Sequence, residues 1–332
     1  MSEYRYNLLT DRWVIIASKR NSRPHDFQCS NVKNLAAHDP ECPFCPGNEK
    51  MTPPETCAVR PDGSLPDSPG WSVRVVPNKY PALTPESDSG SVPSGENCRS
   101  AAGFHEVLIE STHHHQSIPH HSPEHTGLIL CTLRNRYNSF AKTDRIKHIS
   151  VFYNHGRSSG ASLLHPHFQI IALSSTPPNV ISQLEHCRKY YLQHQKSPLA
   201  SILEQEQAQT IRVISANKHF VALCPFASMC PFEVYFVPVN DISSPGQLTD
   251  TMIPDLAQLL QDTLLRLDNG LGDPDYNLVF HTAPVQDDAI GFRFYIQLYP
   301  RLATMGGFEL STDIFINTVS PENAAAFYAH RD

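Results

Sequence analysis

The spacing of apolar and polar residues predicts a chain of short strands and a few longer helices. Short runs of β-branched and aromatic residues, typical of strands, occupy 13–17, 106–109, 149–153, 212–214, 220–223, 234–237 and 292–300. Apolar residues at helical spacing predict helices over 122–144, 179–195 and 249–267. The first of these begins with Ser122, Pro123 and Glu124, which is a good helix start. Segments 52–70 and 84–102 are rich in Pro, Ser, Gly and Asp, so we expect long loops there.

One further predicted strand carries polar side chains on a single face. Between the apolar pair Leu163-Leu164 and the apolar run 170–173, the sequence reads His-Pro-His-Phe-Gln. Because side chains alternate along a strand, His165, His167 and Gln169 share one face. An imidazole is nucleophilic and ligates metals, and an amide donates hydrogen bonds without adding charge. The set suits phosphoryl chemistry, although in a chain with 18 histidines the pattern alone also fits ordinary core residues.

Length and composition agree with a soluble enzyme. The 332 residues, 40% of them hydrophobic, are enough for two domains or one duplicated unit. Segment 279–300 echoes the arrangement around Asn154 and His165, which indicates an internal duplication. We expect a cytoplasmic protein without a membrane span, since no apolar segment is long enough and the first residues lack an apolar signal. The net charge of −7 argues against nucleic acid as a partner.

The cysteines suggest a metal rather than disulfides. Nine cysteines without dense regular spacing indicate reduced thiols. Cys42 and Cys45, followed by the turn residues Pro46-Gly47-Asn48, have a spacing that lets two thiolates hold one zinc ion. The spacing alone also fits two unremarkable thiols or a redox pair, although the thioredoxin-like context of a redox pair is missing.

Several motifs, in order along nearly the whole chain, carry a family resemblance. They are Arg-Tyr-Asn near the start, Cys-x-x-Cys-x-Gly-Asn, the run 76–83 (Val-Pro-Asn-Lys-Tyr-Pro-Ala-Leu), Asn-x-Gly at 154–156, His-Pro-His-x-Gln and Gly-Gly-Phe-Glu at 306–309. Together they resemble the galactose-1-phosphate uridylyltransferases and their relatives, the transferase branch of the histidine-triad superfamily, which includes ADP-glucose phosphorylases. The resemblance implies an α+β fold of two histidine-triad-like domains, residues 1–175 and 176–332, whose antiparallel sheets are covered by helices. It also implies a homodimer.

The resemblance implies one zinc site and argues against a second metal. The implied zinc ligands are Cys42, Cys45, His114 and His165, and the register through His113, His114 and His115 leaves a slip of one residue open. Some relatives bind a second metal through one glutamate and three histidines. At those positions this chain has Gln183, His281, Tyr295 and Gln297. Because only His281 matches, we expect the second metal to be absent.

The resemblance also assigns the chemistry. His167 would attack the α-phosphorus of a nucleotide sugar, with its other ring nitrogen bonded to a backbone carbonyl, and form a nucleotidyl-histidine. Gln169 and Ser162 would donate to phosphate oxygens as charge builds in the transition state. Histidine-triad hydrolases have a third histidine in place of Gln169, so transfer is favoured over hydrolysis. Phe168 replaces the small residue of relatives, and we expect it to pack away from the reacting face, against a helix or a partner subunit.

Substrate contacts are implied in the same way. Matching positions give phosphate contacts to Arg20, Arg23 and Asn154, nucleoside contacts to Asn78 and Lys79, and sugar contacts to Phe308 and Glu309. The implied substrates are a nucleotide sugar and a hexose 1-phosphate, foremost UDP-glucose and galactose 1-phosphate, in a ping-pong exchange. The alternatives are an ADP-glucose phosphorylase, in which phosphate accepts the adenylyl group, and a catalytically silent zinc-stabilised binding protein.

Overall fold

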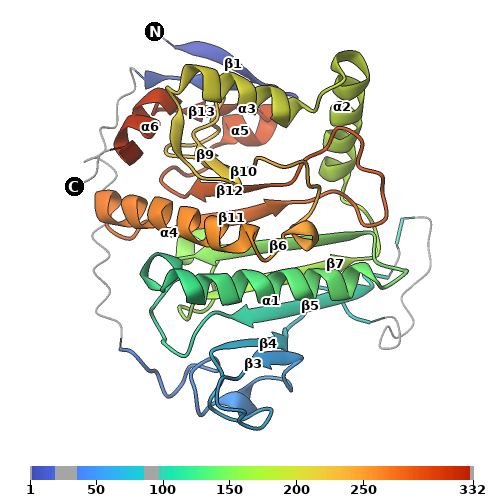
Figure 1. The fold of residues 1–332 in the computed structure, drawn as a ribbon, viewed down its shortest axis with the longest axis vertical. Coiled ribbons are helices and arrows are strands. Elements are labelled where there is room, and N and C mark those ends of the chain that lie inside the picture. The colour runs from blue at the N-terminus through green and yellow to red at the C-terminus, as the bar shows by residue number, and fades with distance from the viewer. Residues whose placement is uncertain (1, 19–35, 86–96, 99, 330–332) are drawn as a thin grey trace.

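A computed structural model describes residues 2–18, 36–85, 97–98 and 100–329, and within them the main strands form one long antiparallel sheet (Figure 1). Each neighbouring pair in this sheet is antiparallel. From edge to edge its ten strands are β3 (Cys57–Val59), β4 (Val73–Pro77), β5 (Gly103–Ile109), β7 (His167–Leu173), β6 (His148–His155), β11 (Tyr276–His281), β12 (Tyr295–Pro300), β10 (Val234–Pro238), β9 (Phe220–Leu223) and β8 (Val213–Ala216).

The strand order repeats from each edge toward the centre, as an internal duplication predicts. The order 3-4-5-7-6 meets the order 8-9-10-12-11 where β6 pairs with β11, with Asn154 opposite Asn277. Val107 pairs with Gln169 in the first half, and Tyr235 pairs with Gln297 at the matching place in the second. The sheet and the main core continue across the predicted boundary after residue 175, and the division into two domains stays a prediction.

Helices cover the two faces of the sheet unequally. Helices α1 (Pro123–Ala141) and α4 (Met252–Leu271) contact each other and cover one face of both halves (Figure 1). The hydroxyl of Ser122 accepts the backbone N–H of His125, so α1 begins where the sequence predicts. On the other face, α2 (Pro178–His194) and α3 (Pro198–Gln209) pack over the second half. The same face of the first half lies beside the cysteine-containing segment.

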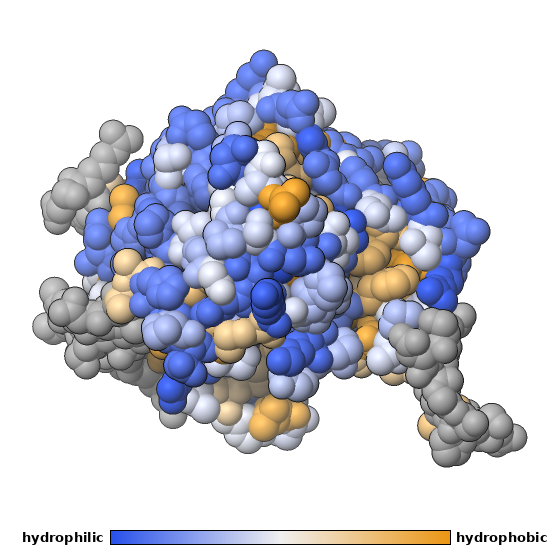
Figure 2. Space-filling view, turned by 90° about the horizontal axis from the view of Figure 1, so that it is seen from below, coloured by the Kyte–Doolittle hydropathy of each residue, from blue (hydrophilic) through white to orange (hydrophobic). Residues whose placement is uncertain are grey.

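The remaining elements are short. A second sheet joins β1 (Glu3–Asn7), β2 (Arg12–Ile16) and β13 (Phe315–Asn317), next to α5 (Gly307–Thr312) and α6 (Pro321–Ala329). Single 3₁₀ turns are η3 (Glu49–Met51), η5 (Ile118–His120), η6 (Arg157–Ser159) and η7 (Pro245–Gln247). The face in Figure 2 is mostly hydrophilic, with apolar side chains in small separate groups. No described helix combines the length and apolar character needed to cross a membrane.

One expectation about local structure changes, and one about Phe168 can be compared with the core. The predicted loop 52–70 contains the edge strand β3, because Cys57–Val59 pairs with β4, while most of the predicted loop 84–102 lies outside the described residues. Phe168 points away from His167 and lies in the main core together with residues of α1 and α4, on the helix-covered face of the sheet. Its ring lies 4.9 Å from that of Tyr153 and 6.1 Å from that of Phe280, between centroids.

This packing predicts a large loss of stability on truncating Phe168. The side chain is 1% exposed in the main core, so Phe168→Ala should lower the free energy of unfolding by about 3–5 kcal/mol. Urea denaturation measures the change. Leu65→Ala, at a 76% exposed position, is the control and should change the free energy by less than about 0.5 kcal/mol. An equal effect of the two substitutions would contradict the packing.

Candidate active site and metal centre

The cysteine-containing loop is held in shape by its own turn residues. The side-chain amide of Asn48 donates to the carbonyl oxygens of Pro40, at 2.9 Å, and Cys42, at 2.8 Å. Gly47 has a φ of +93°, which glycine adopts without strain. The turn residues Gly47 and Asn48, directly after Cys45, therefore close the loop back on itself. They fold the loop so that both thiols face the start of β7.

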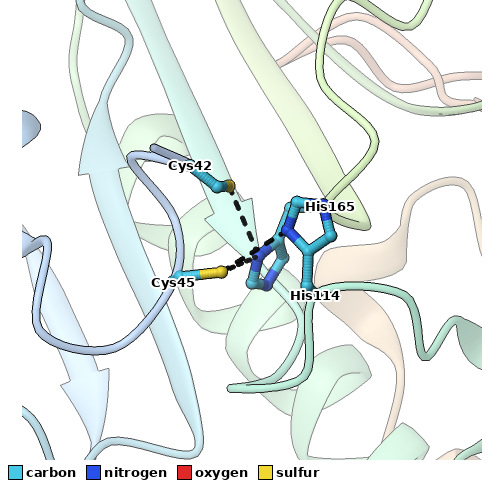
Figure 3. Close-up of side chains that lie close together, drawn as sticks. All are labelled: Cys42, Cys45, His114 and His165. Carbon is cyan, nitrogen blue, oxygen red and sulfur yellow. Dashed lines mark hydrogen bonds between the residues drawn. The ribbon is translucent and has the colours of Figure 1, made fainter. Parts of the chain in front are cut away.

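The two thiols meet two histidines in a buried cluster (Figure 3). The ligand atoms of Cys42, Cys45, His114 and His165 all lie within 4.8 Å of one another. Sulfur-to-Nδ1 distances are 3.4 Å for Cys45–His114, 3.6 Å for Cys45–His165 and 3.7 Å for Cys42–His165. A tetrahedral ion with bonds of about 2.3 Å to sulfur and about 2.0 Å to nitrogen holds such atoms roughly 3.5 Å apart. The donor set therefore fits one metal ion, and His114 is the member of the histidine run that joins it.

Hydrogen bonds outside the cluster orient its ligands. The Nε2 of His165 lies 2.9 Å from the carbonyl oxygen of Ser111, and because a carbonyl only accepts, this nitrogen carries the proton and Nδ1 is free for a metal. The carboxylate of Asp39 lies 3.9 Å from the Nε2 of His114, which is close enough for an electrostatic contact but too far for a hydrogen bond. The backbone N–H of Asp39 donates to the sulfur of Cys45 at 3.3 Å.

Burial sets the protonation of the free cluster. It lowers the pKa of His165 to about 4 and raises the pKa of Cys42 to about 11. At neutral pH the imidazole is therefore neutral, as a metal ligand must be, and the Cys42 thiol keeps its proton until a metal displaces it.

His167, the predicted nucleophile, begins β7 directly beyond the metal cluster. Its side chain is 5% exposed, and Phe44 lies edge-on to its ring with a centroid separation of 5.3 Å. The Nδ1 atom is 2.8 Å from the carbonyl oxygen of His165 and so must donate to it, as the sequence analysis expects. Nε2 is then the nitrogen with a free lone pair. Burial lowers the pKa of His167, which keeps that lone pair unprotonated at neutral pH.

A cavity of about 410 Å³ opens beside His167. Five of the predicted site residues line it, namely Ser162, His167, Gln169, Asn78 and Lys79. Its other walls are largely apolar and come from the cysteine-containing loop, η3, β4, β5 and the loop before β7. These residues are Pro43, Phe44, Met51, Thr52, Pro53, Val76, Pro77, Tyr80, Val107 and Leu163. The apolar walls and the few polar groups suit a flat base joined to a phosphate group.

One residue at this site was not singled out from the sequence. The Nε2 of His105, on β5, lies 2.9 Å from the side-chain oxygen of Gln169 and 3.2 Å from the amide nitrogen of Asn78. Alternation from Val107, the cavity-facing residue of the same strand, would have placed His105 on that face. The predicted strand began at Glu106, one residue too late to include it.

Other predicted contacts are not gathered in this cavity. Asn154 lines a neighbouring cavity of about 230 Å³, and its oxygen accepts a 2.7 Å hydrogen bond from Asn277. Phe308 and Glu309 lie on α5, beside the small sheet and far from β4 in Figure 1. The Glu309 carboxylate accepts the backbone N–H of Gly306 and so caps its own helix. The remaining two, Arg20 and Arg23, lie outside the described residues.

The side chains at the positions where some relatives hold a second metal hydrogen-bond to one another and to Glu233. The Nε2 of His281 lies 2.8 Å from the oxygen of Gln297, whose amide donates to Glu233 at 2.6 Å. The amide of Gln183 donates to the hydroxyl of Tyr295 at 3.3 Å. This network uses the groups that a metal would need, and the absence of a second metal stays a prediction.

Comparison with known proteins identifies the family. Residues 1–177 match the family described as "Galactose-1-phosphate uridyl transferase, N-terminal domain", and residues 99–329 match a domain of unknown function (DUF4921). The chain is 36% identical over 329 residues to an ADP-glucose phosphorylase from Arabidopsis thaliana, covering 97% of this chain and 91% of the relative. The chain belongs to the galactose-1-phosphate uridylyltransferase family. It is an enzyme of that family's nucleotidyltransferase type.

Two further relatives extend the comparison. The galactose-1-phosphate uridylyltransferase of Thermotoga maritima is 28% identical over 341 residues, covering 98% of this chain and 97% of the relative. A crystal structure of the Arabidopsis thaliana ADP-glucose phosphorylase with bound ADP-glucose superposes with a TM-score of 0.84 at 33% identity, covering 100% of both chains. These similarities confirm the predicted family and the α+β histidine-triad fold.

The cluster geometry predicts bound zinc that depends on one member of the histidine run. Purified protein should hold about one zinc ion per chain, and His114→Ala should lose most of it because a closed four-ligand site is broken. Elemental analysis and the melting temperature before and after chelation measure this. His113→Ala is the matched control and should keep its zinc. Zinc-free wild-type protein would contradict the site, and loss in His113→Ala alone would contradict the register.

Proposed function

We propose that this protein transfers a nucleotidyl group from a nucleotide sugar through His167, with ADP-glucose as donor and inorganic phosphate as acceptor. The observation that carries the proposal is the geometry of His167. Its Nδ1 is bound to a carbonyl, its Nε2 is free, and its ring borders a cavity that also contains Gln169 and Ser162. A neutral imidazole held in one orientation is what attack on phosphorus requires.

The reaction divides into two displacements. In the first, the Nε2 lone pair forms a bond to the α-phosphorus while the bond from that phosphorus to the bridging oxygen breaks, which releases glucose 1-phosphate. The Nδ1–H bond to the carbonyl of His165 stabilises the positive charge that the ring then carries. In the second, a phosphate oxygen attacks the same phosphorus, the P–N bond breaks, and ADP leaves with His167 restored. Gln169 and Ser162 donate to the non-bridging oxygens in both steps.

Zinc fits this scheme as a structural ion. Cys42, Cys45, His114 and His165 would fill all four positions of a tetrahedral ion, and such closed sites contribute folding energy. His165 is both a ligand and the source of the carbonyl that orients His167. The ion would therefore fix the position of the nucleophile.

The choice of ADP-glucose rests on the relatives and the second-metal positions. Identity to the ADP-glucose phosphorylase is 36%, against 28% to the Thermotoga maritima uridylyltransferase over a similar length. Gln183, Tyr295 and Gln297 stand where some relatives have ligands of a second metal. Their presence favours the relatives without that metal, which include ADP-glucose phosphorylases. Uridylyl transfer from UDP-glucose to a hexose 1-phosphate is the second candidate, supported by the match of residues 1–177 and by the near-complete coverage of the uridylyltransferase.

A contribution of α5 to sugar binding requires a second copy of the chain. Phe308 is 43% exposed on α5, and neither it nor Glu309 borders the cavity at His167. We therefore include a homodimer in the proposal, in which α5 of one protomer approaches the cavity of the other. Sedimentation or light scattering tests this part.

A substrate screen decides between the two candidates. ADP-glucose with phosphate should turn over with at least tenfold higher kcat/KM than UDP-glucose with galactose 1-phosphate, which corresponds to about 1.4 kcal/mol of transition-state preference. The measurement is release of glucose 1-phosphate in a coupled assay. Preference for the second pair would replace the proposed substrates, and no turnover with either would favour the silent binding protein. Multiple-turnover release of free mononucleotide without an acceptor would place the protein among hydrolases.

The pKa of His167 predicts the pH dependence of the first step. Only the neutral ring can attack, and burial lowers its pKa below the ordinary 6.5. The single-turnover rate constant for glucose 1-phosphate release from ADP-glucose should therefore be level from about pH 7 to pH 8 and fall only below about pH 6.5. Rapid quench with the diphosphate donor avoids titration of an acceptor phosphate. A midpoint at or above about pH 7 would contradict the buried environment of the ring.

A further inference from the structure

His105 faces the amide of Gln169 from the adjacent strand. In the antiparallel register of β5 and β7, Val107 lies opposite Gln169 and His105 opposite Ile171, so the imidazole reaches the glutamine diagonally. Its Nε2 lies 2.9 Å from the oxygen of Gln169. His105 is itself half-buried and does not border the cavity at His167. Any effect on the reaction would pass through the side chains that it touches.

The tautomer of His105 follows from its second contact. The backbone N–H of Ala82 points at Nδ1 from 3.2 Å, so Nδ1 is an acceptor without a proton. A neutral imidazole then carries its proton on Nε2. Burial lowers the pKa of His105 and favours this neutral form. The Nε2–H therefore donates to the oxygen of Gln169.

This bond fixes which end of the glutamine amide is available to a substrate. A free amide turns by half a turn between two states, and only one presents N–H donors to an anionic phosphate. With its oxygen held by His105, Gln169 keeps its amide nitrogen for other partners. The opposite orientation would place a carbonyl oxygen against a phosphate oxygen, which is repulsive.

The side-chain amide of Asn78 is also held in one orientation. Its oxygen accepts the backbone N–H of Tyr80 at 2.8 Å, so its nitrogen faces the Nε2 of His105 at 3.2 Å. Two donors cannot bond to each other, which leaves the N–H groups of Asn78 for a ligand in the cavity.

We propose that His105 is a positioning residue that orients the Gln169 amide toward the reacting phosphate. The inference rests on the proposed nucleotidyl transfer and extends it by one residue. It assigns the Ala82–His105–Gln169 chain a role in the transition state. A purely structural role, in which His105 only ties the loop after β4 to β5, predicts loss of stability without a selective loss of rate.

The test compares two substitutions that differ in the donor. His105→Gln can place an amide nitrogen near the position of Nε2, whereas His105→Phe keeps a ring without a donor. His105→Phe should slow the single-turnover release of glucose 1-phosphate from ADP-glucose by roughly 10- to 100-fold, with KM changed less than about threefold, because partners that orient a reacting group affect activity to this extent. His105→Gln should restore most of the rate. Equal rates in the two variants would overturn the inference.

A double substitution shows whether His105 acts through Gln169. In a Gln169→Ala background, His105→Phe should cause little further loss, because the amide that it orients is gone. An undiminished further loss would overturn the inference. Should His105→Phe fail to fold, as judged by zinc content and melting temperature, His105→Asn takes its place, since its amide nitrogen is too short to reach the oxygen of Gln169.

The outcomes separate this inference from the proposed function. Absence of any glucose 1-phosphate release by wild-type protein with ADP-glucose or UDP-glucose would refute the nucleotidyl transfer itself. A wild-type rate in folded His105→Phe protein would refute only the role of His105.

Discussion

The hydrogen bond from the Nδ1 of His167 to the carbonyl oxygen of His165 is the contact on which the site depends. It fixes the tautomer of His167, the proposed nucleophile, and leaves its Nε2 free. The same His165 is fixed through its side chain, which contacts both thiols and the carbonyl oxygen of Ser111. The Cys2His2 cluster and the proposed nucleophile are therefore linked through His165. A change in the cluster would move the carbonyl oxygen that orients the His167 ring.

The two halves of the sheet treat equivalent positions differently. In the first half, Gln169 borders an open cavity. In the second, Gln297 is tied to His281 and Glu233, and α2 and α3 cover the same face. Tyr295 is packed in the apolar cluster beneath these helices. The first half thus keeps a cavity beside His167 and Gln169, whereas hydrogen bonds and side-chain packing occupy the matching positions in the second half.

Much of the local chemistry could be predicted from the sequence because it depends on short-range rules. Alternation along a strand correctly separates His167 and Gln169 from Phe168, and the Cys-x-x-Cys spacing correctly brings two thiols together. The contact between His105 and Gln169 depends on the register of two strands separated by more than fifty residues, which no local pattern reveals. The same holds for Asn154, which faces a second cavity, and for Phe308, which lies on a helix beside another sheet.

The most direct test of the account is covalent labelling of the nucleophile. Wild-type protein mixed with α-phosphorus-labelled ADP-glucose should retain label through an acid-labile, base-stable P–N bond, to about one equivalent per site, and phosphate should discharge it as ADP. His167→Gly protein that keeps its zinc should take up no label, because the attacking nitrogen is gone. Undiminished labelling of His167→Gly protein would contradict the assignment of His167 as the group that carries the nucleotide.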